Sequence, residues 1–207
     1  MDIEYIILGA ICIIAFLIVL FAVVFILTRP IQFEPPERKA GRDGEKYATQ
    51  IIKECLNPED YLLTNVFILS EGKMTELDNV VINGNGVYII EVKNYSGELY
   101  GEEDDYEWLK NKVTYYGNIY QKHVKNPIRQ VKRQIYLLST YLKQNGIKIW
   151  VEGYVFLVEN NSPVTSEYVL HARSDIDRAI HSKANRKISR QDVERIVSLL
   201  SMNGFQY

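Results

Sequence analysis

The N-terminal part of the chain contains one unbroken apolar segment. From Tyr5 to Thr28 there are twenty-four consecutive residues without a charged side chain. A helix rises 1.5 Å per residue, so this length is enough to cross a hydrocarbon core of about 30 Å. No basic region precedes the segment and no small-residue cleavage site follows it, which distinguishes it from a secretory signal peptide. The pattern predicts one transmembrane helix at residues 5–28.

The charges on either side of this segment differ in sign. Asp2 and Glu4 precede it, whereas basic residues follow it: Arg29, Arg38, Lys39 and Arg42. Basic residues concentrate on the cytoplasmic side of membrane helices. We therefore expect a single-pass protein of the cell membrane, with the N-terminus outside and the remaining chain in the cytoplasm.

After residue 30 the spacing of apolar residues alternates between two periods. The helical period predicts helices at 41–56, 127–145 and 175–181, and a last helix capped near Ser189. Runs rich in Val, Ile and Tyr predict strands at 61–70, within 75–93, at 149–158 and at 168–172, with short strands at 97–101, 106–109 and 113–116. The two longer helices each have one apolar stripe, as helices that cover a sheet require. The pattern predicts an α/β fold.

The same pattern predicts four parts of the chain. A transmembrane helix at 5–28 is followed by an extended linker at 29–40, which contains two adjacent prolines. Residues 41–160 form the main domain, and residues 161–207 form a strand-and-helix extension that packs on it.

The centre of the main domain is a predicted hairpin around residues 83–86, which read Asn-Gly-Asn-Gly. Asn-Gly favours a type I′ turn because both residues tolerate a positive φ. If Gly84 and Asn85 form the loop, Asn83 pairs with Gly86. Shifting the centre of the turn by one residue changes the register by two, which leaves every side chain on the same face.

This register brings three charged residues together at one end of the hairpin. Counting back from the turn places Asp78 opposite Glu91, with Lys93 on the same face. Two carboxylates at the end of an apolar strand repel each other and lose solvation. Mg²⁺ or Mn²⁺ would remove both costs, because hard divalent cations prefer carboxylate oxygens. The alternative is an ordinary hairpin whose charges emerge into solvent where the strand leaves the core.

The charge of the whole chain does not favour a nucleic-acid partner, since 24 basic residues are balanced by 26 acidic ones. One local cluster does: Lys122, Lys125, Arg129, Lys132 and Arg133, just after Tyr115, Tyr116 and Tyr120. Basic residues interleaved with aromatic ones can hold a phosphate backbone and stack on bases. The alternative is a solvated helix face.

Two further polar positions have open interpretations. Gln130 and Gln134 are four residues apart in the helix at 127–145, so they share one face beside its apolar stripe. They either bond to nearby loops or point toward the carboxylates. Glu45 lies in the predicted first turn of the helix at 41–56, where a carboxylate complements the helix dipole.

Several of these motifs occur in an order that resembles a known family, the nuclease-related domain (NERD). They are Gly44-Glu45, Glu76-Leu77-Asp78, Glu91-Val92-Lys93, Trp108 and Asn126-Pro127-Ile128-Arg129-Gln130. The resemblance covers roughly residues 40–160. The family is similar to the PD-(D/E)xK nucleases, which implies a restriction-endonuclease-like α/β/α sandwich with a mixed central sheet. No proline precedes Asp78, and Asn79 follows it, which departs from the motif's name.

The resemblance implies a role for each matching residue. Asp78 and Glu91 would bind the metal, Lys93 would be the catalytic lysine, and Glu45 and Gln130 would support the site. The implied function is hydrolysis of nucleic-acid phosphodiesters, with Mg²⁺ or Mn²⁺ as cofactor, by a protein anchored to the membrane through residues 5–28. The alternatives are a catalytically inactive, membrane-tethered domain that binds nucleic acid, and one that binds protein.

Overall fold

The computed structural model describes residues 3–28, 35–159, 162–181, 187–202 and 205–206, and the chain divides into two units, Met1–Pro35 and Pro36–Tyr207. The first unit contains helix α1 (Ile3–Leu27), which coincides with the apolar segment. Among the residues whose side chains are described, no helix is both long enough and apolar enough to cross a membrane. The transmembrane helix therefore stays a prediction.

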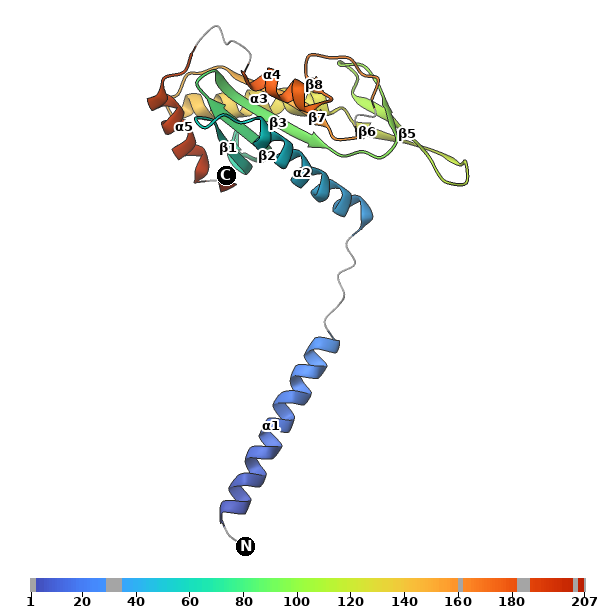
Figure 1. Ribbon diagram of the computed structural model, residues 1–207, viewed down its shortest axis with the longest axis vertical. Helices are drawn as coiled ribbons and strands as arrows, with labels where there is room; N and C mark the ends of the chain where they lie inside the picture. The colour runs from blue at the N-terminus through green and yellow to red at the C-terminus, as the bar shows by residue number, and fades with distance from the viewer. Residues whose placement is uncertain (1–2, 29–34, 160–161, 182–186, 203–204, 207) are drawn as a thin grey trace. The chain divides into compact units, whose positions relative to one another are not determined.

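The second unit is built on a six-stranded sheet with the order β8-β7-β3-β2-β1-β9 (Figure 1). Its strands are β1 (Tyr61–Ser70), β2 (Lys73–Asn83), β3 (Gly86–Lys93), β7 (Val151–Leu157), β8 (Val169–Leu170) and β9 (Phe205–Gln206). Strands β1, β2 and β3 are antiparallel neighbours, whereas β7 runs parallel to β3 and β8 runs parallel to β7. The sheet is therefore mixed, as predicted, and strand β9 is an addition that the sequence pattern did not reveal.

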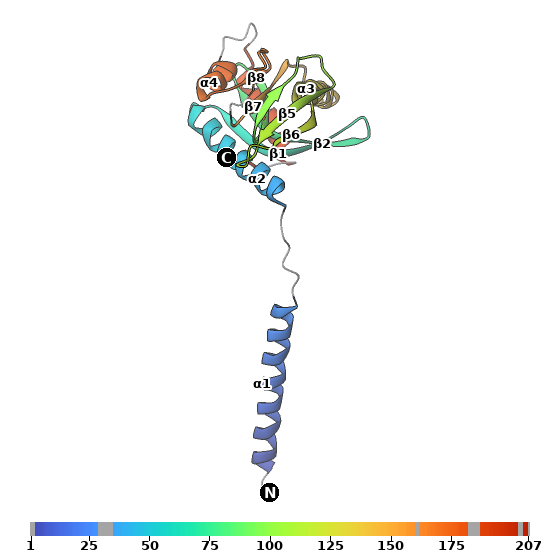
Figure 2. The same ribbon diagram turned by 90° about the vertical axis from the view of Figure 1, so that its right-hand side faces the viewer.

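Helices cover both faces of this sheet (Figure 2). They are α2 (Pro36–Cys55), α3 (Pro127–Gln144), α4 (Arg173–His181) and α5 (Arg190–Ser201). In β3, Val87 and Ile89 belong to the core shared with α3 and α5, while Tyr88 and Ile90 belong to the core shared with α2 and α4. Alternate residues of one strand thus feed opposite cores. The domain is an α/β/α sandwich with β3 at its centre.

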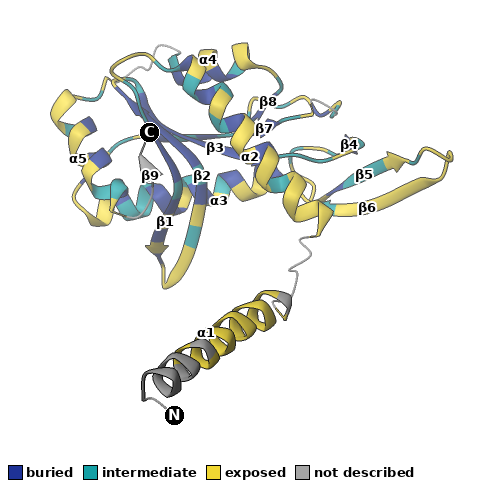
Figure 3. Cartoon of the chain, turned by 60° about the horizontal axis from the view of Figure 1, so that its bottom comes forward, coloured by how far each residue is buried: buried dark blue, intermediate teal, exposed yellow. Residues whose placement is uncertain are grey.

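A second, smaller sheet has the order β4-β5-β6 and consists of β4 (Glu98–Tyr100), β5 (Glu107–Val113) and β6 (Ile119–Lys125). The β5–β6 hairpin extends from the body of the domain and is largely exposed (Figure 3). Only its base is buried, at Trp108, whose indole N–H donates to the Glu102 carbonyl over 3.0 Å.

The central turn has a different geometry from the prediction. Asn83 pairs with Gly86, as the two-residue loop requires. Neither Gly84 nor Asn85 has a positive φ, however, so the predicted type I′ turn is wrong. The Asn83 side chain explains the difference, because its Oδ1 accepts the N–H groups of Asn85 (2.9 Å) and Gly86 (3.2 Å) and closes the turn itself.

Two predicted boundaries also differ. Helix α2 begins at Pro36, within the predicted linker, because proline is well suited to the first helical position. The strand predicted at 113–116 is instead mostly the turn between β5 and β6, where Gly117 has a φ of 79°. Lys122 and Lys125 consequently lie on β6 and not on a helix.

Candidate active site

The predicted site lies where two central strands separate. The β2–β3 pairing ends at Asn79 and Ile90, whereas β3 continues to pair with β7 as far as Lys93. Beyond that point the Asp78 Oδ2 accepts the backbone N–H of Val92 over 2.8 Å. The Asp78 carboxylate thus takes the place of a β2 carbonyl as the acceptor for Val92, the residue directly after Glu91.

The strand on the other side of Asp78 is distorted. In the β1–β2 register, Thr64 faces Asn79 and Val66 faces Leu77, so Asn65 falls beside Asp78 and is skipped in the ladder. Asn65 has a φ of 51°, a left-handed conformation that asparagine tolerates better than most residues. The distortion leaves Asp78 half-buried at a hollow of about 360 Å³, which Asn65 and Glu45 also line.

Glu91 is the centre of the site. Its side chain is buried, and its Oε1 accepts the Lys93 ammonium and the Gln130 amide, each over 2.5 Å. Its Oε2 accepts the amide of buried Gln134 over 2.6 Å. Three donors from β3 and α3 therefore compensate one buried carboxylate, as a buried charge requires.

Gln134 is the residue whose role the sequence left most open. Its amide also donates to the Glu76 carbonyl over 3.3 Å, while its own Oε1 is buried and has no partner in the described part of the chain. The unpartnered oxygen is a cost that the bond to Glu91 offsets. Its helical spacing from Gln130 was the available signal, and the docking of α3 on the sheet turns both amides toward Glu91.

The charges at the site change one another's pKa. Burial, and then the negative charge of Glu91, raise the pKa of Asp78 to about 7, although the Val92 N–H and Lys93 oppose the change. Burial lowers the pKa of Lys93, but the charge and hydrogen bond of Glu91 exceed this effect, so the pKa of Lys93 is raised overall. Asp78 is therefore partly protonated near neutral pH, while Lys93 remains an ammonium.

Glu45 comes to the site from α2. Partial burial, followed by the charges of Glu76 and Glu91, raises the pKa of Glu45, although the residue as a whole is exposed. It lines a second hollow of about 330 Å³ together with Lys93 and Tyr95. Because α2 begins at Pro36, Glu45 lies well past the first turn, and the predicted interaction with the helix dipole is wrong.

A glycine allows α2 to approach so closely. A Cβ on buried Gly44 would lie 2.4 Å from the Cβ of Asn94, the residue just after β3. The Asn94 amide in turn donates to the Ala40 carbonyl of α2 over 2.8 Å. The small residue before Glu45 thus lets the helix lie against the end of the strand that carries Glu91 and Lys93.

The donor set suits a hard divalent cation. A carboxylate offers about four lone-pair positions, of which Glu91 uses three, and the one described hydrogen bond to Asp78 is made at Oδ2. The electrostatic repulsion between these two carboxylates is the kind of strain that a cation relieves. Within the described residues, no three His, Cys, Asp and Glu side chains form a metal-binding group.

The predicted nucleic-acid-binding residues do not form one free cationic surface. Lys132 pairs with Glu103 over 2.6 Å, and Arg133 pairs with Glu71 over 2.7 Å. Lys122 lies 3.8 Å from Glu37, in an exposed pair of small energetic weight. The remaining two are Arg129, which lies over the Tyr106 ring at 5.3 Å, and Lys125, at the end of β6.

One cationic residue at the site was missed by the sequence reasoning. Lys110 lies directly opposite Lys122 in the β5–β6 ladder, and both line the hollow that contains Lys93. Like charges directly opposite each other are unfavourable without an anion. The sequence pattern predicted no strand at 119–125, so it could not show that Lys110 lies opposite Lys122.

Fold and site together define a class: an α/β/α protein in which an Asp from one central strand and a Glu-x-Lys sequence from the next meet where the strands separate. The family model described as the nuclease-related domain (NERD) matches residues 40–158, and the chain belongs to this family.

One relative illustrates how far this similarity extends. An uncharacterized protein of Bacillus anthracis is 26% identical to this chain over 186 residues, which cover 88% of this chain and 76% of that protein. No solved structure gives a significant match.

Proposed function

We propose that the protein is a metal-dependent nuclease with a restriction-endonuclease-like active site, which hydrolyses phosphodiesters of DNA or RNA. The observation that supports this most is the environment of Glu91, whose buried carboxylate is bound by Lys93, Gln130 and Gln134 and whose charge helps to raise the pKa of Asp78. Membership of the nuclease-related family agrees with this chemistry.

Each side chain has a role consistent with its environment. The raised pKa keeps Lys93 protonated, so it stabilises negative charge that develops on a phosphate and does not act as a base. Buried Gln134 holds the Glu91 carboxylate in orientation, whereas exposed Gln130 is placed to contact substrate. Glu45, whose pKa is raised, is positioned to accept a proton at the edge of the site.

Asp78 and Glu91 would hold the Mg²⁺ or Mn²⁺. The bound ion would supply Lewis-acid polarisation of a phosphate oxygen and would acidify a coordinated water. The chain's own contribution is to keep two carboxylates close together at the cost of a raised pKa at Asp78, which prepares the position for a cation.

The proposed setting is the cytoplasmic side of the cell membrane, with α1 as a single-pass anchor. The apolar side chains described in α1, such as Phe16, Ile18 and Phe21, are exposed within its unit. Such a helix is stable in a hydrocarbon environment, where its backbone groups bond internally. The basic residues that follow the apolar segment support the proposed orientation.

A second candidate is a catalytically inactive, membrane-tethered domain that binds nucleic acid or protein. The supporting observation is that Lys93, Gln130 and Gln134 already compensate the Glu91 charge without a metal. A network of this kind can be retained for stability alone.

A cleavage assay separates the two candidates. The full chain, purified in detergent, would be incubated with single- and double-stranded DNA and RNA in Mg²⁺, in Mn²⁺ or in EDTA. We expect cleavage only with a divalent ion. Lys93→Gln should lose at least about 100-fold in rate, as is typical when a transition-state donor is removed. Lys73→Gln, an exposed lysine at the start of β2, is the matched control. Binding of nucleic acid without cleavage under every condition would favour the inactive domain.

A further inference from the structure

The two tryptophans of the chain have opposite environments. Trp108 is fully buried, whereas Trp150, directly before β7, is 76% exposed. An indole has a large apolar surface, and leaving it in water forgoes much of the hydrophobic free energy that its burial would provide. An exposed tryptophan on a folded domain is therefore informative when a hollow lies beside it.

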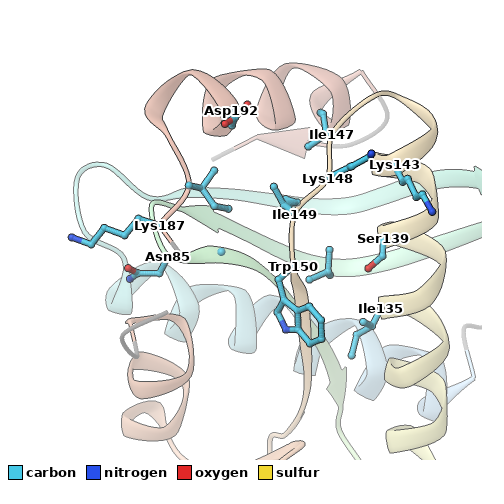
Figure 4. A pocket seen from close by; sticks show the side chains of 13 residues that line it. Asn85, Ile135, Ser139, Lys143, Ile147, Lys148, Ile149, Trp150, Lys187 and Asp192 are labelled. Carbon is cyan, nitrogen blue, oxygen red and sulfur yellow. The ribbon is translucent and has the colours of Figure 1, made fainter. Parts of the chain in front are cut away.

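Trp150 borders a hollow of about 670 Å³ between α3, the start of β7 and α5 (Figure 4). Its apolar lining includes Ile135 of α3, Ile149 and Ile188. This volume lies within the range of sites that hold small organic molecules, and an apolar lining with a few polar groups is typical of them. The Asn85 amide and the Ser139 hydroxyl also line it.

The charged residues around this hollow are mainly basic. Lys143, Lys148 and Lys187 line it, and Asp192 is the one acidic residue among its lining residues. Within the described part of the chain, none of these lysines takes part in an ion pair, in contrast to Lys132 of the predicted basic cluster. Unpaired cations around an apolar hollow favour an anionic ligand.

The other side of Trp150 has the opposite charge. A hollow of about 370 Å³ there is lined by Trp150, Glu152 and Glu167 but by no basic residue. Phosphate groups would be repelled from this side. An anion that contacts the indole is thus directed to the hollow with the lysines.

This hollow is distinct from the carboxylate site. Gly86, at the start of β3, lines it, whereas Glu91 lies five residues further along the same strand. At about 3.3 Å per residue the separation along the strand is roughly 17 Å. A ligand of nucleotide size can occupy one site without contacting the other.

We propose that the Trp150 hollow is a nucleotide-binding site. The base stacks on the exposed indole and contacts the isoleucines, and the phosphate is held by Lys143 and Lys148, which come from the end of α3 and the loop after it. Aromatic stacking with a neighbouring basic rim is the chemistry with which proteins hold single nucleotides and unpaired strands. The ligand is either a free nucleotide or one nucleotide of a single strand, and the proposal does not depend on the nuclease activity.

Trp150 itself reports on occupancy. The full chain in detergent and EDTA would be titrated with AMP, ADP and a short single-stranded oligo(dA), with tryptophan emission as one readout and calorimetry as the other. We expect saturable binding that quenches the exposed indole. Saturation by AMP or ADP identifies a free nucleotide, whereas saturation by oligo(dA) alone identifies a nucleotide within a strand. Adenosine and inorganic pyrophosphate, each carrying half of the proposed chemistry, should bind at least about tenfold more weakly.

Variants test both halves of the site. Trp150→Ala should weaken nucleotide binding by about tenfold or more, because stacking on an aromatic side chain contributes substantially to each base. Lys143→Gln combined with Lys148→Gln should do the same, while Lys46→Gln and Asp78→Asn should leave binding unchanged. No saturable binding at millimolar nucleotide, or equal binding of pyrophosphate without quenching, would overturn the proposal. Loss of cleavage in the nuclease assay would not affect it.

Discussion

At the scale of single residues, the site is organised by the charge of Glu91. Its carboxylate accepts three hydrogen bonds. Burial, and then the charge of Glu91, raise the pKa of Asp78 to about 7. The two carboxylates are therefore not equivalent. Glu91 is compensated by protein donors, whereas Asp78 has one backbone N–H. Because few donors stabilise the charged form of Asp78, its pKa is raised, and the stability of the protein should depend on pH.

The stability of the metal-free protein should fall as the pH rises from about 4 to about 7. The folded state raises the pKa of Asp78 from an ordinary value of 3.8 to about 7, so the folded protein binds this proton more tightly than the unfolded chain does. The stabilisation is complete below about pH 4 and is lost through that window, by roughly 2–4 kcal/mol at about 1.4 kcal/mol per pKa unit. Denaturant unfolding in EDTA at several pH values measures it.

Asp78→Asn is the variant that isolates this effect. It should remove most of the pH dependence and be more stable than the unchanged protein at pH 8, because the carboxylate repulsion is gone. Added Mg²⁺ should stabilise the unchanged protein at pH 8 but not Asp78→Asn. Asp104→Asn, in the exposed turn before β5, is the control and should keep the full pH dependence. A flat pH profile of the unchanged protein would contradict the raised pKa.

Gln130 and Gln134 form a matched pair, since both donate to Glu91 from the same helix but differ in burial. Gln134→Leu leaves a buried carboxylate oxygen without its donor and should cost about 1–3 kcal/mol of folding free energy. Gln130→Leu should cost much less, because water can replace an exposed amide. Chemical denaturation of the two variants tests this order, and equal losses would show that burial is not the deciding factor.

At the scale of elements, the approach of α2 to the end of β3 depends on one glycine. Helix α2 has glycines at positions 41 and 44, and a Cβ on Gly41 would meet no atom within 4 Å, whereas one on Gly44 would meet Asn94 at 2.4 Å. The two glycines therefore have different reasons for being present. Gly41 lowers the helix propensity of α2, whereas Gly44 permits its close packing against Asn94.

Alanine substitutions should reveal this difference. Gly41→Ala should stabilise the protein by about 0.5–1 kcal/mol, because alanine is the better helix former and the space is open. Gly44→Ala should destabilise it by about 1–3 kcal/mol through overpacking against Asn94, and should reduce cleavage by displacing Glu45. Thermal unfolding of both variants measures the two changes in stability, and the cleavage assay measures the loss of activity in Gly44→Ala. A stabilising Gly44→Ala would show that α2 can shift at no cost.

At the scale of the whole molecule, the chain consists of an apolar helix and a domain with balanced charge. We expect the full chain to sediment with membranes and to need detergent for release, because α1 exposes apolar side chains along the described part of its length. Removal of residues 1–28 should release the domain into the soluble fraction. Protease added outside intact cells should leave the domain uncut, and recovery of the full chain as a soluble protein would contradict the anchor.

The sequence by itself determined the relative positions of Asp78, Glu91 and Lys93. Strand side chains alternate with period two, so every hairpin register left these three on one face, and the observed pairing of Asn83 with Gly86 is the predicted one. It also determined the ends of α3, because Asn126 caps it through its side chain and Gly146 follows with a φ of 75°. These features depend on residues that are near in sequence.

The tertiary structure decided what surrounds those residues. Gln134 bonds to Glu91, 43 positions away, so the docking of α3 chose the carboxylate over the nearby loops as its partner. Arg133 bonds to Glu71, 62 positions away, which neutralises part of the predicted cationic cluster. The exposure of Trp150 also depends on tertiary packing, because the periodicity of the sequence does not predict that the residues around the start of β7 leave a hollow. Long-range packing chooses among contacts that local pattern leaves equally possible.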